Sequence, residues 1–255
     1  MIELKNIHKS FHNTNILKDV SLEFKQGSVN IIIGQSGSGK TVMLKCLVGL
    51  YEVDQGGVIY GGQNFTRMNL KERKEIRKEI GMLFQGSALF DSQTVEQNVI
   101  FPLSMFTNMS EEEKLDRANF CLKRVDLINS NNKYPAEISG GMKKRVAIAR
   151  AIAMNPKYLF CDEPNSGLDP ATSILIDNLI KEITEEYNIT TVVITHDMNS
   201  VIEIGENIAF LHKGQIAWKG DKNEILRSEN KILNDFVYAS SFMKKVRESM
   251  IKNDF

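Results

Sequence analysis

Gly34-Gln35-Ser36-Gly37-Ser38-Gly39-Lys40-Thr41 is the stretch of this chain that predicts its fold. It fits the pattern G-x-x-x-x-G-K-[ST], whose glycines let several backbone N–H groups point at one phosphate. An apolar, β-branched run, Val29 to Ile33, precedes it, and a helical pattern, Thr41 to Leu50, follows it. We therefore expect a phosphate-binding loop between a buried strand and a helix. Lys40 would reach the β- and γ-phosphates, and the Thr41 hydroxyl would bind Mg²⁺.

The sequence on either side of this loop alternates between strand and helix patterns, which predicts a parallel sheet covered by helices. Residues 86–155 are richer in helix patterns, and Ser110 to Glu113 form a capping box there. We expect a nucleotide-binding domain over residues 1–230 that includes a helical subdomain at about 86–155, and a C-terminal helical extension over 231–255. The expected elements are a half-buried strand at Val20 to Phe24, helices at Leu70 to Glu79 and Ala171 to Tyr187, and strands at Ile80 to Phe84, Tyr158 to Cys161 and Thr191 to Thr195.

Composition excludes several classes of function. The 255 residues hold 32 Lys and Arg against 32 Asp and Glu, which argues against a general nucleic-acid binder or a polybasic membrane anchor. The uncharged run from Gln97 to Ser110 is too short to cross a bilayer, and the N-terminus lacks an apolar signal core. Three widely separated cysteines indicate a reducing compartment. We expect a cytosolic protein whose role at a membrane, if any, depends on another chain.

Two acidic residues follow an apolar strand pattern at Tyr158 to Cys161. Ligands of parallel α/β sheets bind at the carboxyl ends of strands, which is where Asp162 and Glu163 would lie. Asp162 is placed to hold Mg²⁺, directly or through water. Glu163 is placed to activate water against a γ-phosphate.

Ser139-Gly140-Gly141 opens a helical pattern about twenty residues before this acidic pair. In that position, between the phosphate-binding loop and Asp162, the tripeptide (below, the signature) resembles the signature of ATP-binding-cassette (ABC) ATPases. Four more positions resemble the family in order and spacing: Phe11 as the adenine-stacking aromatic, Gln85 of the Q-loop, Asp169 of the D-loop and His196 as the switch histidine. The resemblance extends over residues 1 to about 220.

The resemblance implies the P-loop NTPase fold of ABC ATPases, an α/β fold with a mostly parallel core sheet, an antiparallel β subdomain and a helical subdomain. It implies ATP and Mg²⁺ as ligands, with Gln85 also on the metal, Glu163 as general base and His196 beside the γ-phosphate. Two cassettes would clamp two ATP molecules, so that the signature and Asp169 act on the nucleotide of the other chain. A homodimer bound to an integral membrane permease, at the cytoplasmic face of the inner membrane, is therefore expected.

The stretch from Leu83 to Val95 contains an Ala-Leu-Phe-Asp-Ser phrase, residues 88–92. Together with Met142, it resembles lipid-transport cassettes of the Mla/Mce type, which implies phospholipid cargo and an Mce-type lipid-binding partner. Three alternatives stay open: the cassette of an amino-acid or other small-solute importer, a regulatory cassette of the cell-division kind, and a nucleic-acid or ribosome-associated ATPase. The last usually has insertions that this chain lacks.

The C-terminal region has a heptad-like apolar pattern: Ile232, Phe236, Ala239, Met243, Val246 and Met250. One interpretation is a helix that packs on its own domain. The other is a contact with a twin cassette or an accessory subunit.

Overall fold

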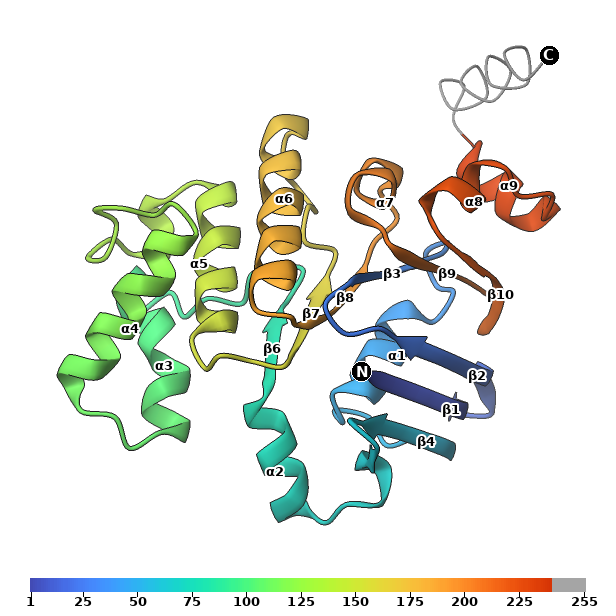
Figure 1. Ribbon diagram of the computed structural model, residues 1–255, viewed down its shortest axis with the longest axis horizontal. Coiled ribbons are helices and arrows are strands. Elements are labelled where there is room, and N and C mark those ends of the chain that lie inside the picture. The colour runs from blue at the N-terminus through green and yellow to red at the C-terminus, as the bar shows by residue number, and fades with distance from the viewer. Residues whose placement is uncertain (240–255) are drawn as a thin grey trace.

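The computed structural model describes residues 1–239 and contains two sheets, with helices packed on them and a group of helices at one end (Figure 1). The strands are β1 (Ile2–Phe11), β2 (Thr14–Phe24), β3 (Val29–Ile33), β4 (Gln55–Tyr60), β5 (Gln63–Asn64), β6 (Ile80–Leu83), β7 (Tyr158–Asp162), β8 (Thr190–Ile194), β9 (Asn207–His212) and β10 (Gln215–Gly220). The α-helices are α1 (Lys40–Leu47), α2 (Leu70–Lys78), α3 (Val95–Phe106), α4 (Glu111–Arg124), α5 (Gly140–Ile152), α6 (Pro170–Glu186), α7 (Met198–Ile204), α8 (Lys222–Leu226) and α9 (Lys231–Val237).

The core sheet has the order β10-β9-β3-β8-β7-β6, and only its β9–β10 pair is antiparallel. Every residue of β3, β7 and β8 is buried, because helices cover one face of these central strands, and α1 together with the second sheet covers the other. Because β3, β7 and β8 run parallel to one another, their carboxyl ends lie at the same edge of the sheet. The segments that follow these strands, including the phosphate-binding loop, therefore start from the same edge.

A second, antiparallel sheet has the order β2-β1-β4-β5. Its inner face packs with α1 on the core sheet in one apolar cluster that includes Ile7, Val20, Met43 and Phe65. The expected strand at Val20 to Phe24 is the second half of a longer strand, β2. This sheet and the parallel sheet confirm the predicted fold class.

Helices α3, α4 and α5 pack against one another at the end of the molecule opposite the antiparallel sheet (Figure 1). Side chains at their N-termini fix where they begin: Thr94 and Ser110 form capping boxes, and the Ser139 hydroxyl accepts from the Met142 N–H. Pro102 lies inside α3, so the uncharged run from 97 to 110 is part helix and part loop. Most of the expected helical subdomain is thus helix, and its exact limits stay a proposal.

Several predicted boundaries shift by one to three residues. Helix α1 ends at Leu47 rather than Leu50, because Gly49 adopts a left-handed conformation with φ of 72°. Strand β7 extends to Asp162, so this carboxylate belongs to the strand itself.

Among residues 1–239, no helix combines the length and apolar character that a bilayer crossing requires. Of the heptad-like pattern, Phe236 packs partly buried against the main apolar cluster, whereas Ile232 is 47% exposed and Ala239 is exposed. The α9 residues buried in that cluster are Leu233 and Val237, which lie outside the pattern. Met243, Val246 and Met250 lie outside the described residues.

Candidate active site

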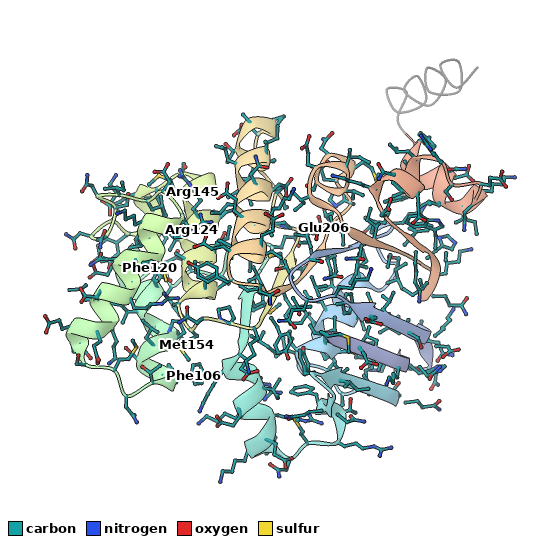
Figure 2. All side chains as sticks on the ribbon, viewed as in Figure 1. Phe106, Phe120, Arg124, Arg145, Met154 and Glu206 are labelled. Carbon is teal, nitrogen blue, oxygen red and sulfur yellow. The ribbon has the colours of Figure 1, made fainter. Side chains whose placement is uncertain are left out.

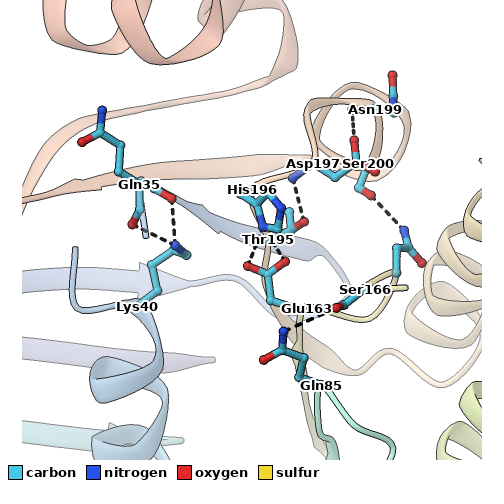
Figure 3. A network of polar contacts seen from close by, with 12 residues as sticks. Gln35, Lys40, Gln85, Glu163, Ser166, Thr195, His196, Asp197, Asn199 and Ser200 are labelled. Atoms are coloured by element: carbon cyan, nitrogen blue, oxygen red, sulfur yellow. Dashed lines mark hydrogen bonds and ion pairs between the residues drawn. The ribbon is translucent and has the colours of Figure 1, made fainter. Parts of the chain in front are cut away.

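The phosphate-binding loop curls between β3 and α1 as predicted. Gly37 and Gly39 have φ of 77° and 107°, a conformation that other residues rarely adopt. The Lys40 side chain folds back over the loop, and its Nζ donates to the carbonyl oxygens of Gly34 at 2.7 Å and Gln35 at 3.2 Å (Figure 3). Burial lowers the pKa of Lys40, while the nearby carboxylates of Glu163 and Asp162 oppose that shift. The loop therefore presents a nearly buried cation, held by neutral carbonyls, to a ligand.

A cleft of about 850 Å³ lies beside this loop. Its lining combines the loop with side chains from the ends of three other core strands and from α9. The lining residues are Ile16, Gly34, Gln35, Ser36, Gly37, Gly39, Lys40, Thr41, Val42, Gln85, Glu163, His196, Met198, Asp235, Phe236 and Ala239. The phosphate-binding loop, Gln85, Glu163 and His196 lie far apart in the sequence, and the structure brings them together in this one cleft.

Glu163 and His196 both line this cleft, and Asp162 precedes Glu163 at the end of β7 without lining it. His196 Nδ1 and a carboxylate oxygen of Glu163 are 2.9 Å apart, and the His196 side chain is 70% exposed whereas that of Glu163 is 14% exposed. Asp162 is buried, and its Oδ1 atom has no hydrogen-bond partner among the described residues. Burial and, secondarily, the neighbouring Glu163 charge raise the pKa of Asp162. A cation at Asp162 would compensate for this unpaired oxygen.

Glu163 has an unusual backbone conformation for a residue with a side chain. Its φ is 48°, in the left-handed region, which costs about 1–3 kcal/mol for a residue other than glycine. Its N–H donates to the Ile194 carbonyl at 2.9 Å, so β8 helps to hold this turn. The turn aims the Glu163 carboxylate at His196.

Two further hydrogen bonds connect the loops around the cleft (Figure 3). The exposed Gln85 amide donates to the Ser166 hydroxyl at 3.4 Å. Asn165, beside it in the D-loop, donates to the Ser200 hydroxyl of α7 at 3.0 Å. The segments that follow β6, β7 and β8 are therefore linked through short side chains.

The signature residues are not in this cleft. Ser139 and Gly140 are exposed at the start of α5, and a Cβ at Gly141 would lie 2.6 Å from Thr172 Cγ2 of α6. Asp169 caps α6 by accepting from the Thr172 N–H at 3.0 Å. The structure thus separates the signature and Asp169 from the loop of the same chain.

Phe11 is also absent from the cleft lining. Its ring lies edge-on to Tyr51 with centroids 5.1 Å apart, and Lys9 Nζ lies 5.1 Å from its centroid. Ile16 lines the cleft instead. Phe11, the predicted adenine-stacking residue, therefore contacts Tyr51 and does not line the cleft.

Sequence reasoning missed the residues that α9 and α5 contribute. Asp235, Phe236 and Ala239 line the cleft, although the apolar pattern around them predicted only a packing or partner surface. Lys144 of α5 is buried, and it contacts the main chain of Gln85. Nothing in the basic run that contains Lys144 marks it as buried, because burial depends on tertiary packing.

The comparison with protein families supports the resemblance. The family model described as "ABC transporter" matches residues 17–166. The methionine import ATP-binding protein MetN of Clostridium acetobutylicum is 41% identical over 246 residues, which cover 96% of this chain and 73% of the relative. The probable ribonucleotide transport ATP-binding protein mkl of Mycobacterium leprae is 36% identical, over 92% of this chain and 68% of the relative. This chain belongs to the ABC transporter family, as an ATP-binding cassette with ATPase activity.

A solved structure agrees with this assignment. The ATP-binding cassette MJ0796, in a dimeric post-hydrolysis state bound to ADP and Pi, has a TM-score of 0.80 and 36% identity to this chain, and the match covers 87% of this chain and 99% of that one. The structural match confirms the predicted ABC ATPase fold.

Proposed function

We propose that the cleft binds ATP and hydrolyses it with the residues that the sequence predicted. The observation that carries the proposal is the convergence of the phosphate-binding loop, Glu163, His196 and Gln85 around one cleft. The loop N–H groups and Lys40 would bind the phosphates, because both offer donors to anionic oxygens in a partly desolvated site.

The residues of the cleft also suit Mg²⁺. Asp162, next to the cleft-lining Glu163, offers a buried carboxylate oxygen that has no partner among residues 1–239, and Thr41, which lines the cleft, offers a hydroxyl from the first turn of α1. Among residues 1–239, no cluster of three or more His, Cys, Asp or Glu residues is arranged to hold a metal. Few protein ligands, with the remainder supplied by phosphate and water, are typical of Mg²⁺ sites. Gln85 is proposed as a further ligand. When bound, Mg²⁺ would neutralise phosphate charge.

Glu163 is proposed as the general base. Its carboxylate would accept the proton of the attacking water, and its hydrogen bond with His196 restrains the direction in which it points. His196, more exposed, would hold the water and the γ-phosphate. Lys40 would exchange the carbonyls of Gly34 and Gln35 for phosphate oxygens when ATP enters.

A dimer of cassettes would complete each site. The signature and Asp169 lie away from the phosphate-binding loop of their own chain and are exposed, so a second copy can present them to the nucleotide. The MJ0796 cassette is described as dimeric with ADP and Pi bound, which supports a homodimer here. A site divided between chains would form only on closure. The adenine partner is proposed to remain Phe11, after rearrangement of its contact with Tyr51.

We propose that the cassette serves an importer of an amino acid or another small solute, through an integral membrane permease. It would act at the cytoplasmic face of the inner membrane. The support is the 41% identity to a methionine import ATP-binding protein over nearly the whole chain. This favours the small-solute alternative over the lipid-transport expectation, which no relative named above supports.

Lipid transport with an Mce-type partner is the second candidate. One observation favours it: the phrase at residues 88–92, with Met142, resembles Mla/Mce cassettes. Relatives at 41% and 36% identity are named for different cargo, methionine and ribonucleotide, so the cassette sequence alone is a weak indicator of cargo.

Glu163→Gln tests the ATPase site. Loss of the base should lower the rate of phosphate release by about a hundredfold or more. ATP should then accumulate unhydrolysed and hold the dimer together, which gel filtration with light scattering would detect. Glu185→Gln, an exposed change on α6, is the matched control. Wild-type turnover by Glu163→Gln would contradict the assignment.

The cargo requires a separate experiment. The complex would be purified from its native membrane, and the attached proteins and lipids would be identified. A permease whose reconstituted vesicles take up a labelled amino acid on ATP addition would support the importer. An Mce-type subunit with bound phospholipid would support the second candidate.

A further inference from the structure

Lys144 is a buried cation for which the proposed chemistry has no role. It lies on α5, five residues after Ser139 of the signature, and is 4% exposed. Among residues 1–239 it forms no ion pair; its Nζ instead makes a short hydrogen bond to the Gln85 carbonyl and lies 3.5 Å from the Glu163 carbonyl. Burial lowers the pKa of Lys144, and the nearby carboxylates of Asp162 and Glu163 oppose that shift only in part. A buried ammonium group that is held mainly by carbonyls is costly to folding. Its retention at this point suggests a role other than stability.

The two carbonyls that Lys144 approaches belong to the two residues whose placement matters most for hydrolysis. The Glu163 backbone is in the left-handed region, with φ of 48°, and such a conformation persists only where surrounding contacts hold it. The Ile194 carbonyl holds its N–H, and Lys144 is the cation beside its C=O. The strained turn is thus held from β8 on one side and from α5 on the other.

A second cation of α5 holds the rest of the Q-loop. Arg150 donates to the carbonyls of Ser87 at 2.8 Å and Ala88 at 2.7 Å, two residues that also have left-handed φ, 62° and 49°. Arg150 is close to the Q-loop and not to Glu163. Lys144 differs from it in contacting both the Q-loop and the catalytic turn.

We propose that Lys144 is a positioning residue that ties Glu163 and Gln85 to the signature helix, so that movement of α5 places or misplaces the catalytic carboxylate. Helix α5 packs on α3 and α4 and carries the signature at its N-terminus. Engagement of that signature by a second cassette would therefore act, about one and a half helical turns away, on the chain's own Glu163. This inference rests on the proposed role of Glu163 as the base.

Lys144→Met tests the proposal in the full chain. We expect kcat for ATP hydrolysis to fall about tenfold, because a base misplaced by a fraction of an ångström loses alignment. KM for ATP should change less than about twofold, since Lys144 does not line the cleft. The Tm should hold or rise, because the desolvation of this buried charge outweighs its attraction to the nearby carboxylates. Lys144→Gln, which keeps an N–H donor without the charge, should recover part of kcat.

Two variants of the same helix serve as controls. Lys143→Met alters the half-buried neighbouring lysine and should leave kcat unchanged. Arg150→Lys loosens the other Q-loop contact and should lower kcat less than Lys144→Met does. Equal losses from Arg150→Lys and Lys144→Met would overturn the proposal in favour of general Q-loop loosening.

Three other results would overturn it: wild-type kcat in Lys144→Met, a fall in kcat matched by a comparable fall in Tm, or an effect on KM alone. None of these depends on the outcome for Glu163→Gln. If Glu163→Gln is inactive and Lys144→Met is fully active, only this inference fails. If Glu163→Gln is fully active, the proposed function fails first.

Discussion

Tyr60 and Asp162 are both buried at the end of a strand, but the polar atom of Tyr60 has a hydrogen-bond partner and one oxygen of Asp162 has none among the described residues. Tyr60, the last residue of β4 in the antiparallel sheet, is 1% exposed, and its hydroxyl donates to the Leu47 carbonyl at 2.9 Å. Burial raises the pKa of that phenol, so it remains a neutral donor. Asp162, at the end of β7 beside the cleft, has a buried oxygen with no partner among the described residues.

The difference separates the parts of the molecule that hold the fold from those that await a ligand. In the antiparallel sheet and beneath it, the Tyr60 hydroxyl is hydrogen-bonded and apolar side chains pack in one cluster. Figure 2 shows the side chains of that sheet and of the helical subdomain at opposite ends of the molecule, with Phe106 and Phe120 on the latter. Beside the cleft, Lys40, Asp162 and the turn at Glu163 are left in unfavourable states that a bound nucleotide would relieve. Changes in the first region should alter stability, and changes in the second should alter binding or turnover.

The largest expected effect is on stability, from Phe65→Ala under the antiparallel sheet. The Phe65 ring is 2% exposed, lies edge-on to Tyr60 at 5.5 Å and carries the Arg73 guanidinium 5.2 Å from its centroid. Removing the ring should lower the free energy of unfolding by about 3–5 kcal/mol. Urea denaturation would measure this. ATP affinity of the folded protein should not change.

Tyr60→Phe is the matched control for that experiment. It keeps the ring and removes the hydroxyl, so the loss should be about 1 kcal/mol. If either variant weakened ATP binding while leaving stability intact, the distinction between the two regions would be wrong.

The next effect is on ATP binding, from Lys40→Met. Loss of a charge-assisted contact to phosphate should weaken ATP affinity by about a hundredfold, measured by calorimetry. The Tm should not fall, because an apolar side chain replaces a nearly buried ammonium group. Lys18→Met, an exposed change on β2, should leave ATP affinity unaltered. A large fall in Tm for Lys40→Met would show that Lys40 supports the fold.

The smallest effect is a pH dependence of stability that comes from Asp177 on α6. Burial is the main cause of a pKa raised to about 6; the nearby Ser200 and Asn165 side chains oppose the shift, and the charges of Asp197 and Glu203 reinforce it. The folded state therefore binds a proton at Asp177 more tightly than the unfolded chain does. The contribution of Asp177 to the free energy of unfolding rises as pH falls from about 6 towards 4.

Asp177→Asn should remove that dependence. We expect the variant to be more stable than the wild type at pH 7 by roughly 2 kcal/mol, with the difference closing at pH 4. Urea midpoints across this pH range would measure it. An unchanged pH profile would indicate that Asp177 stays ionised in the fold.

The elements that sequence patterns predicted well are those with local causes. The β-branched run of β3 and the glycines after it specify a buried strand and a curled loop without help from distant residues. The same patterns predict that Asp162, Glu163 and His196 lie at the ends of two strands, and the structure pairs those strands and places Glu163 and His196 within hydrogen-bond distance. Helix and strand limits were less well predicted, because they depend on caps such as Gly49.

What sequence patterns did not predict are contacts between elements far apart in the chain. The burial of Lys144 requires β6, β7 and α5 to meet, and nothing in the run Lys143-Lys144-Arg145 distinguishes the three cations. The approach of α9 to the cleft and the pairing of Phe11 with Tyr51 are likewise results of packing.

By itself, the sequence determined the type of fold, the phosphate-binding loop and the acidic strand end, because glycine conformation and hydrophobic periodicity are local properties. Only the tertiary structure decided which polar groups are left unpaired and which cation supports the Glu163 turn. It also decided that the signature lies apart from the phosphate-binding loop of its own chain. Those properties follow from desolvation and distance, and both arise only when remote segments pack together.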